Sequence, residues 1–249
     1  MQRLLTGLAV TTVLLSSGPL ALASPFYSPP APEEDAPTFS GDAELGFTRL
    51  SGNTNSQTLI AKGRLTWLTG DWTHTLRGET RNVTRDGETS AEQYLVAGRE
   101  RYDLSGPHYL FGFARWEQDR FSGFDYQFTT IGGYGRQILD SDTHDLSVEA
   151  GPGYRIDAIR DDETEELGVA YGAFAYSWEF SSTASFDQEA SIEATDDNVT
   201  TRSLSSLTAK LNSRLALRLS HEIKHNSQPP ETADASTDLT TSASLLYSW

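Results

Sequence analysis

The stretch "RLALRLSHEIKH", Arg214–His225, decides the fold of this chain. Its residues alternate between two kinds: Leu215, Leu217, Leu219, His221, Ile223 and His225 on one side, and Arg214, Ala216, Arg218, Ser220, Glu222 and Lys224 on the other. A period of two over this length is typical of a half-buried β-strand. The following "NSQPP", residues 226–230, ends the pattern with turn-forming residues.

The same stretch contains His-Glu-x-x-His, the pattern by which many zinc proteases hold their metal. That chemistry requires a helix, because only there do two histidines four positions apart share a face with the glutamate beside them. On a strand Glu222 points away from both histidines, which lie too far apart to share a metal. We therefore expect no zinc site here.

Strand-like alternation continues in both directions from this segment, in pieces near the length that crosses a membrane as a tilted strand. The faces between 92 and 138 stay unassigned, because Tyr109, Phe111 and Phe113 are apolar and so are the residues between them. Twelve strands are expected, at about 39–50, 56–68, 72–83, 92–103, 108–118, 125–138, 145–157, 166–180, 184–195, 199–211, 214–225 and 237–249.

The connections between these segments alternate in length. Tight turns are expected at 69–71, 104–107, 139–143, 181–183 and 212–213, and generally longer polar loops at "SGNTN", "TRDGETS", "QDRFSGF", "AIRDDETEE", "TDDN" and "NSQPPETADAS". This asymmetry is typical of outer-membrane barrels, whose short turns are periplasmic. The sequence predicts an all-β fold, a single antiparallel transmembrane β-barrel of about twelve strands. A water-soluble sandwich or lipocalin-like barrel is the alternative.

The N-terminal region predicts export. "MQRLLTGLAVTTVLLSSGPLALAS" has a basic Arg3, an apolar core and small residues at Ala21 and Ala23, as a signal peptide does. The next segment, "SPFYSPPAPEEDAPT", is rich in proline and acid and is expected to be a disordered linker. We predict a signal peptide at 1–23, a linker at 24–38 and the barrel at 39–249.

Composition limits the possible partners and cofactors. The chain has 249 residues, no cysteine and a formal net charge of −16, with a mean hydropathy of −0.45. An acidic chain repels phosphate, so no nucleic-acid partner is expected, and no disulfide or cysteine-bound metal can form. Low hydropathy agrees with a barrel, since half of its strand residues face a polar lumen. No cofactor is expected.

Charged side chains on the inward faces are the candidate site residues. Basic and acidic residues there are nearly equal in number, which favours cross-strand ion pairs over a strongly ion-selective pore. The lumen candidates are Lys62, Arg64, Arg77, Glu79, Glu149, Arg155, Asp187, Glu189, Arg202, Lys210, Arg218 and Glu222. Aromatic residues near strand ends are expected at the membrane interfaces: Trp67, Trp72, Trp178, Tyr247 and Trp249.

Two further motifs invite chemical interpretations. "DAIRDDETEE", residues 157–166, groups carboxylates that calcium or magnesium prefers, but it lacks the glycine and ligand order of an EF-hand, so a solvated loop is favoured. His225 and Ser227 could belong to a barrel phospholipase, although neighbours in sequence do not make a triad. No catalytic residue and no metal ligand is assigned.

Several segments in order resemble a known family: "AELGFTRLSGNTNSQT", "YLFGFARWEQDRFSGFDYQ", "VEAGPGYR", "LTAKLNSRLALRLSHEIKHNSQPP" and "TTSASLLYSW". The chain is similar to a family of Gram-negative bacteria that carries the label salt-induced outer-membrane protein and has no known function. The resemblance covers about Phe39 to Trp249. It implies an outer-membrane barrel and supplies no substrate or catalytic residue.

Three functions follow as hypotheses. The first is a non-enzymatic outer-membrane barrel with a structural, envelope-stress role. The second is a narrow channel for small polar solutes, and the third is an outer-membrane hydrolase. The expected partners are the lipid bilayer, lipopolysaccharide and, through the aromatic last strand "LTTSASLLYSW", the barrel-assembly machinery. The oligomeric state is left open.

Overall fold

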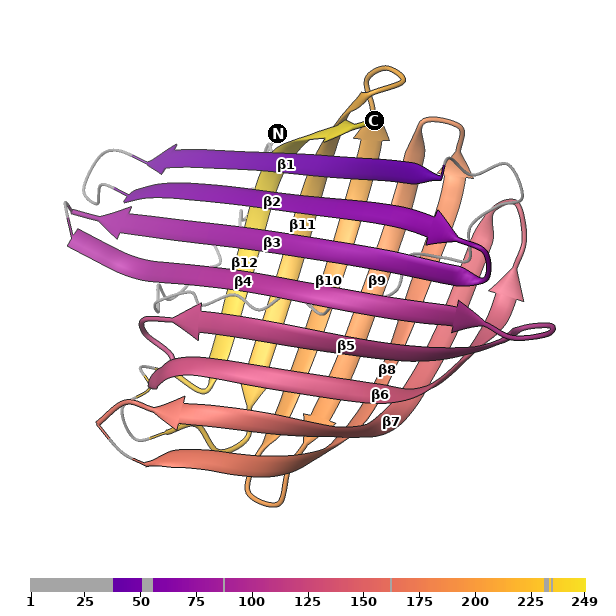
Figure 1. The fold of residues 1–249 in the computed structure, drawn as a ribbon. Coiled ribbons are helices and arrows are strands. Elements are labelled where there is room, and N and C mark those ends of the chain that lie inside the picture. The colour runs from indigo at the N-terminus through magenta and orange to yellow at the C-terminus, as the bar shows by residue number, and fades with distance from the viewer. Residues whose placement is uncertain (1–37, 51–55, 87, 162, 231–232, 234) are drawn as a thin grey trace, which may run out of the picture.

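The described residues form one closed antiparallel barrel of twelve strands (Figure 1). The structure is a computed structural model, which describes residues 38–50, 56–86, 88–161, 163–230, 233 and 235–249. The strands are β1 (Phe39–Leu50), β2 (Ser56–Thr69), β3 (Trp72–Arg85), β4 (Glu88–Asp103), β5 (His108–Asp119), β6 (Phe124–Asp140), β7 (His144–Ile159), β8 (Thr164–Ser181), β9 (Ala184–Ala194), β10 (Val199–Lys210), β11 (Leu215–Asn226) and β12 (Thr237–Ser248).

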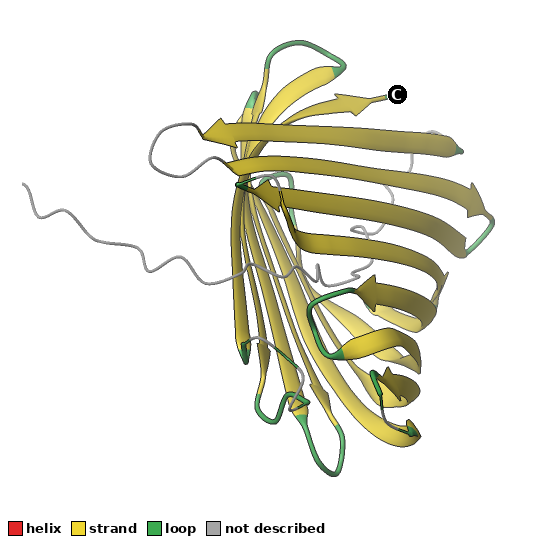
Figure 2. Cartoon of the chain, turned by 90° about the vertical axis from the view of Figure 1, so that its left-hand side faces the viewer, coloured by secondary structure: helices red, strands yellow, loops and turns green. Residues whose placement is uncertain are grey.

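The predicted fold class is confirmed, and each expected strand is present. Strands and their connections make up the described chain (Figure 2). No helix among the described residues is long and apolar enough to cross a membrane. The predicted signal peptide and all but the last residue of the predicted linker lie outside the described residues, so those boundaries stay predictions.

The ring closes between the first and last strands. Residues Asp42–Gly46 of β1 pair with Ser244–Ser248 of β12. The Gly41 amide donates to the Trp249 carbonyl at 3.1 Å, and the Trp249 amide donates back to the Gly41 carbonyl at 3.0 Å. A ring without a free edge is what a lipid environment requires, because lipid offers no hydrogen-bond partner to an unpaired strand.

The connections differ from the expectation on the side of the longer loops. β3 runs to Arg85 and β4 begins at Glu88, so most of the predicted loop "TRDGETS" is strand. Likewise only 120–123 and 160–163 separate the strands of two other pairs. The connections at 195–198 and 227–236 have the predicted lengths to within one residue. Polar residues at these ends extend the strands, because ladder hydrogen bonds form whether or not a side chain is apolar. We call this end the loop end, and the opposite end the turn end.

The outer face of the barrel is apolar. Leu45, Leu76, Val96, Leu110 and Ile192 are all more than two-fifths exposed and come from five different strands. Residues between them on the same strands, such as Arg77 and Glu193, are buried inside. This two-faced alternation places an apolar surface against lipid and polar groups in the lumen.

The sheet turns a tight corner between β6 and β7. A Cβ atom on Gly151 would lie 2.2 Å from the Gly132 carbonyl oxygen, and one on Gly133 would lie 2.3 Å from the Ala150 carbonyl oxygen. No side chain fits between backbones this close, so glycine is required at both positions. This corner lies next to the part of the lumen that is packed most densely with aromatic rings.

Candidate functional site

The structure places the predicted lumen residues on the inward faces of their strands, with one at the rim. Lys210 ends β10 at the turn end and is exposed. Arg77, Glu149, Arg155, Arg202 and Glu222 are buried. The remaining six are partly buried: Lys62, Arg64, Glu79, Asp187, Glu189 and Arg218.

An ion-pair cluster crosses the lumen nearer the loop end, where Glu193 and Asp157 lie close to the ends of β9 and β7. Nη2 of Arg115 on β5 donates to both carboxylate oxygens of Glu193 on β9, each at 2.9 Å, although the residues are 78 positions apart. Arg202 on β10 donates from two nitrogens to the two oxygens of Glu117 on β5, both at 2.9 Å. Hydrogen bonds between charged groups are about twice as strong as neutral ones, and the Arg202–Glu117 pair is also bidentate. The two pairs tie β5 to strands on the opposite wall.

Neighbouring charges complete this cluster. Arg115 Nε donates to Glu117 at 2.6 Å, and Arg155 donates to Asp157 at 3.0 Å. Arg155 also lies 3.9 Å from Glu193. The cluster is therefore three arginines and three carboxylates, each under a tenth exposed: Arg115, Glu117, Arg155, Asp157, Glu193 and Arg202.

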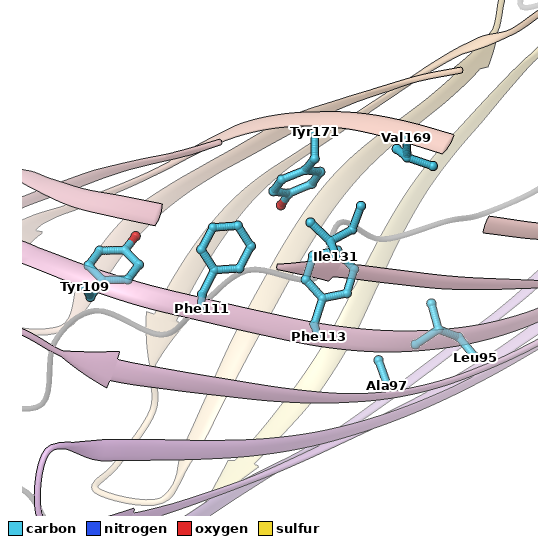
Figure 3. Packing of buried hydrophobic residues seen from close by; sticks show 8 residues of the cluster. All are labelled: Leu95, Ala97, Tyr109, Phe111, Phe113, Ile131, Val169 and Tyr171. Atoms are coloured by element: carbon cyan, nitrogen blue, oxygen red, sulfur yellow. The ribbon is translucent and has the colours of Figure 1, made fainter. Parts of the chain in front are cut away.

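An aromatic cluster fills the lumen on the turn side of this ion-pair cluster, between β4 and β8. Rings of Phe111 and Phe113 face Tyr171 from across the lumen, with centroids 5.9 and 5.5 Å apart (Figure 3). The guanidinium of Arg99 lies 4.8 Å from the centre of the Phe111 ring. The cluster comprises Leu95, Ala97, Tyr109, Phe111, Phe113, Ile131, Val169 and Tyr171. An apolar core inside the lumen differs from the polar interior that the sequence predicted.

Sequence reasoning missed the residues of β4 and β5 that build both clusters. Arg115, Glu117 and Asp119 recur every second position at the end of β5. A charge facing lipid is costly, so these residues had to point inward. Tyr109, Phe111 and Phe113 lie on the same face of β5 as Arg115, because each is an even number of positions away from it, so they also point into the lumen. The charged residues of β5 therefore indicated its inward face, although both faces of the segment contain apolar residues.

A polar cavity remains on the other side of the lumen, towards the turn end. We call it the turn-side chamber, and its volume is about 130 Å³. Arg218 donates to Glu44 at 3.3 Å and Arg64 lies 3.6 Å from Asp42, both along its wall. One oxygen of Glu189 is buried there without a hydrogen-bond partner. Both signs of charge therefore line one space that is large enough for several water molecules.

A second, smaller cavity lies towards the loop end, and we call it the loop-side chamber. Its volume is about 20 Å³. Arg81 and Lys224 contribute cations to it, and Asp119 contributes a carboxylate. Lys62 lines both chambers and forms an ion pair with Glu222 at 3.8 Å. This pair stands between the two spaces.

The predicted interface aromatics are exposed and lie together at the turn end. Trp67 stacks on His74 with centroids 5.2 Å apart, and Trp72 packs at 4.9 Å from Tyr102. Trp178 stacks on His144 at 5.8 Å, and Tyr247 on Trp249 at 5.8 Å. Aromatic rings at the ends of strands suit the boundary between lipid tails and headgroups.

The zinc-protease pattern has no catalytic geometry. His221 and His225 are exposed on the outer face of β11 and bond to Thr241 at 2.9 Å and Thr237 at 2.8 Å, while Glu222 is buried inside. Ser227 donates to Asn198 at 3.2 Å, so its partner is not His225. Within the described part of the chain, no three His, Asp or Glu side chains are grouped to hold a metal. Residue 162 of the acidic loop lies outside that part.

Solved structures with the same architecture are outer-membrane proteins. The outer-membrane channel COG4313 from Pseudomonas putida F1 superimposes with a TM-score of 0.55 and 10% identity, over 90% of this chain and 100% of that one. The translocator domain of the autotransporter NalP from Neisseria meningitidis gives 0.50 and 12%, over 87% and 90%. These similarities show the fold, which is that of an outer-membrane barrel in contact with lipid.

Sequence comparison identifies relatives. The uncharacterized protein YdiY from Escherichia coli (strain K12) is 36% identical over 210 residues, which are 84% of this chain and 83% of that protein. Residues 43–249 match the family described as "Protein of unknown function, DUF481". The chain belongs to this family.

Proposed function

We propose that this protein is a non-enzymatic structural barrel of the outer membrane, with a role in envelope stress and with a lumen that is closed to solutes. The ion-pair cluster carries this proposal. Arg115 and Arg202 bind carboxylates across the lumen with 2.9 Å hydrogen bonds, and each residue is 1% exposed. A conducting pore needs a continuous path of water. Here the charged groups bind each other in place of water.

The aromatic cluster supports the same proposal on the side of β4 to β8. Tyr109 is fully buried and donates to Glu149 at 2.9 Å, so the ring is held by packing and by a hydrogen bond. Apolar side chains that fill a lumen stabilise the barrel as a packed core does. We further propose lipopolysaccharide around the loop end and the barrel-assembly machinery at the last strand as partners of this envelope protein.

Conductance measurements test the closed lumen. Purified protein refolded into planar bilayers should give no discrete current steps at moderate voltage. The double variant Arg115→Ala and Glu193→Ala removes a cross-lumen pair without leaving either charge alone, and it should conduct. Single-channel events from the unmodified protein would overturn the closed lumen. In cells, deletion of the gene should weaken resistance to detergent or osmotic shock without loss of uptake of any one solute.

A narrow channel for small polar solutes is the second candidate, and the chambers favour it. The turn-side chamber is polar and has a volume of about 130 Å³, and Lys62 connects it to the loop-side chamber. In this alternative the Lys62–Glu222 pair is the narrow point. Glu222→Ala with Lys62→Ala should then raise a conductance that the unmodified protein already shows, so the first measurement separates the two candidates.

A further inference from the structure

We propose that the loop-side chamber binds one small monovalent anion, of the size of chloride, between the guanidinium of Arg81 and the ammonium of Lys224. Arg81 comes from β3 and Lys224 from β11, and both line this chamber. The proposal concerns binding and is independent of whether the lumen conducts.

Both cations are buried and lack close counterions. Arg81 and Lys224 are each 4% exposed. Among the residues that the structure describes, no carboxylate lies within 4.0 Å of either charge, whereas Arg99, Arg115 and Arg202 have such partners. Arg81 Nε and Nη1 are buried with no hydrogen-bond acceptor. A buried charge without a partner is strongly unfavourable, so these two cations together favour the uptake of an anion.

The carboxylates of the same chamber are engaged elsewhere. Glu117 receives bonds from Arg115 and Arg202. Asp119 accepts from the Gln93 amide at 2.5 Å and from the Phe121 amide at 2.9 Å. Glu79 pairs with Arg77. Each of these three acids therefore already has another hydrogen-bond or ion-pair partner.

One more acid lies near Lys224. Asp238 on β12 is its cross-strand neighbour in the register, although the pair is not within 4.0 Å. Asp238 balances part of the positive charge at longer range. Nε and Nη1 of Arg81 still lack an acceptor, and a bound anion would supply one.

The size of the chamber selects the ligand. About 20 Å³ is open to the centres of water-sized molecules, and roughly 10–15 Å³ suffices for one water. Chloride or bromide fits such a space, whereas phosphate, a carboxylic acid with a carbon chain or a sugar does not. The ligand class is therefore a halide-sized anion.

The first experiment measures stability of the full chain, folded in detergent, by the temperature at which the folded band is lost in gel electrophoresis. Chloride replaces gluconate stepwise at constant ionic strength. Because a ligand stabilises only the state that binds it, the midpoint should rise and saturate, by roughly 2–4 °C at about fivefold excess over the dissociation constant. Arg81→Gln and Lys224→Gln should each weaken the chloride response at least tenfold.

The matched control is Arg120→Gln, which removes a cation from the exposed β5–β6 connection at the same end of the barrel. It should keep the full chloride response. Identical midpoints in chloride and gluconate for the unmodified protein would overturn the proposal, as would an equal response in all the variants.

A second experiment does not depend on any variant folding. Crystals of the unmodified protein grown in sodium bromide should show one anomalous peak between Arg81 and Lys224. A peak in ordinary density without anomalous signal would mean that the chamber holds only water, and the proposal would be wrong.

Discussion

The two sides of the lumen are packed in different ways. Between β4 and β8 the aromatic cluster fills the space, and nearer the loop end the ion-pair cluster crosses it. The turn-side chamber is lined instead by residues of β1 to β3 and β7 to β11, and most of the charged ones come from β1 to β3, β9 and β11. We call these sides the aromatic half and the chamber half. One barrel thus contains both a packed core of the kind found in soluble proteins and a polar space.

Charged residues in this lumen therefore have two separate roles. In one half they pack against rings and other charges, and in the other half they line a polar space. In the aromatic half, arginines lie over rings, as Arg101 does 3.8 Å from the centre of Tyr109. Cation–π contacts and bidentate pairs replace water there. In the chamber half, Arg64 and Asp42 stay about three-tenths exposed and can keep their hydration. Four sets of substitutions test this division.

The largest effect is expected from Gly151→Val at the corner beside the aromatic half. The added side chain would collide with the Gly132 carbonyl and the Gly133 backbone, which cannot move without breaking the ladder. We expect no folded barrel, measured as loss of the compact band in gel electrophoresis. Gly78→Val in the chamber half is the control, because nothing lies within 4 Å of its Cβ position. A folded Gly151→Val protein would show that the corner is not fixed.

Arg115→Ala comes next. It leaves Glu193, which is 0% exposed, with a weakened set of counterions, and it removes a donor from Glu117. Breaking a buried pair from one side costs about 3–5 kcal/mol. Urea unfolding of the protein in lipid vesicles measures the loss.

The control for this loss is the exposed pair of Arg120 and Glu92, 3.3 Å apart. Arg120→Ala should cost about 0–1 kcal/mol, because water screens the charges. Equal losses of stability in Arg115→Ala and Arg120→Ala would contradict the exclusion of water from the ion-pair cluster.

Phe113→Ala and Leu204→Ala compare packing in the two halves. Phe113 contacts Tyr171 within the aromatic cluster, so its truncation creates a cavity that costs about 3–4 kcal/mol. Leu204 already borders the turn-side chamber, and its truncation should cost less, about 2 kcal/mol, at the low end for a buried leucine. Chemical unfolding of both variants gives the ranking. If Leu204→Ala costs more, the chamber half is packed as tightly as its counterpart.

The smallest effect is expected from Arg64→Ala. Its ion pair with Asp42 at 3.6 Å is partly solvated on both sides. Pairs of this kind contribute about 0–1 kcal/mol. Stability measured in low and high salt should differ little between Arg64→Ala and the unmodified protein, and a loss of several kcal/mol would show that this half is also sealed.

Much of the fold could be predicted because alternation is a local signal. The expected strand at 39–50 has the observed bounds of β1, and the expected 56–68 differs from β2 by one residue. The loop end could not be predicted as well, since "TRDGETS" contains turn residues but pairs as strand up to Arg85 and from Glu88. Hydrogen bonding to the neighbouring strand prevails there over the preference of single residues.

The candidate site could be predicted only in part. The alternation along β7 alone predicts that Glu149 and Arg155 point into the lumen. It does not predict their partners. Glu149 pairs with Arg99 and Arg155 lies near Glu193, and both partners are on other strands. Alternation along a strand shows which residues point inward. It gives no distance to the opposite wall of the barrel.

From the sequence alone we could predict the twelve strands, the pairing of neighbours and the two faces of the strands outside 92–138, because a period of two and the turns between strands act over short distances. Only the tertiary structure decided what the lumen contains. Arg202 and Glu117 are 85 positions apart and meet because the closed ring curves their strands onto opposite walls. Closure sets the distance across the barrel, and that distance decides whether side chains touch or leave a chamber.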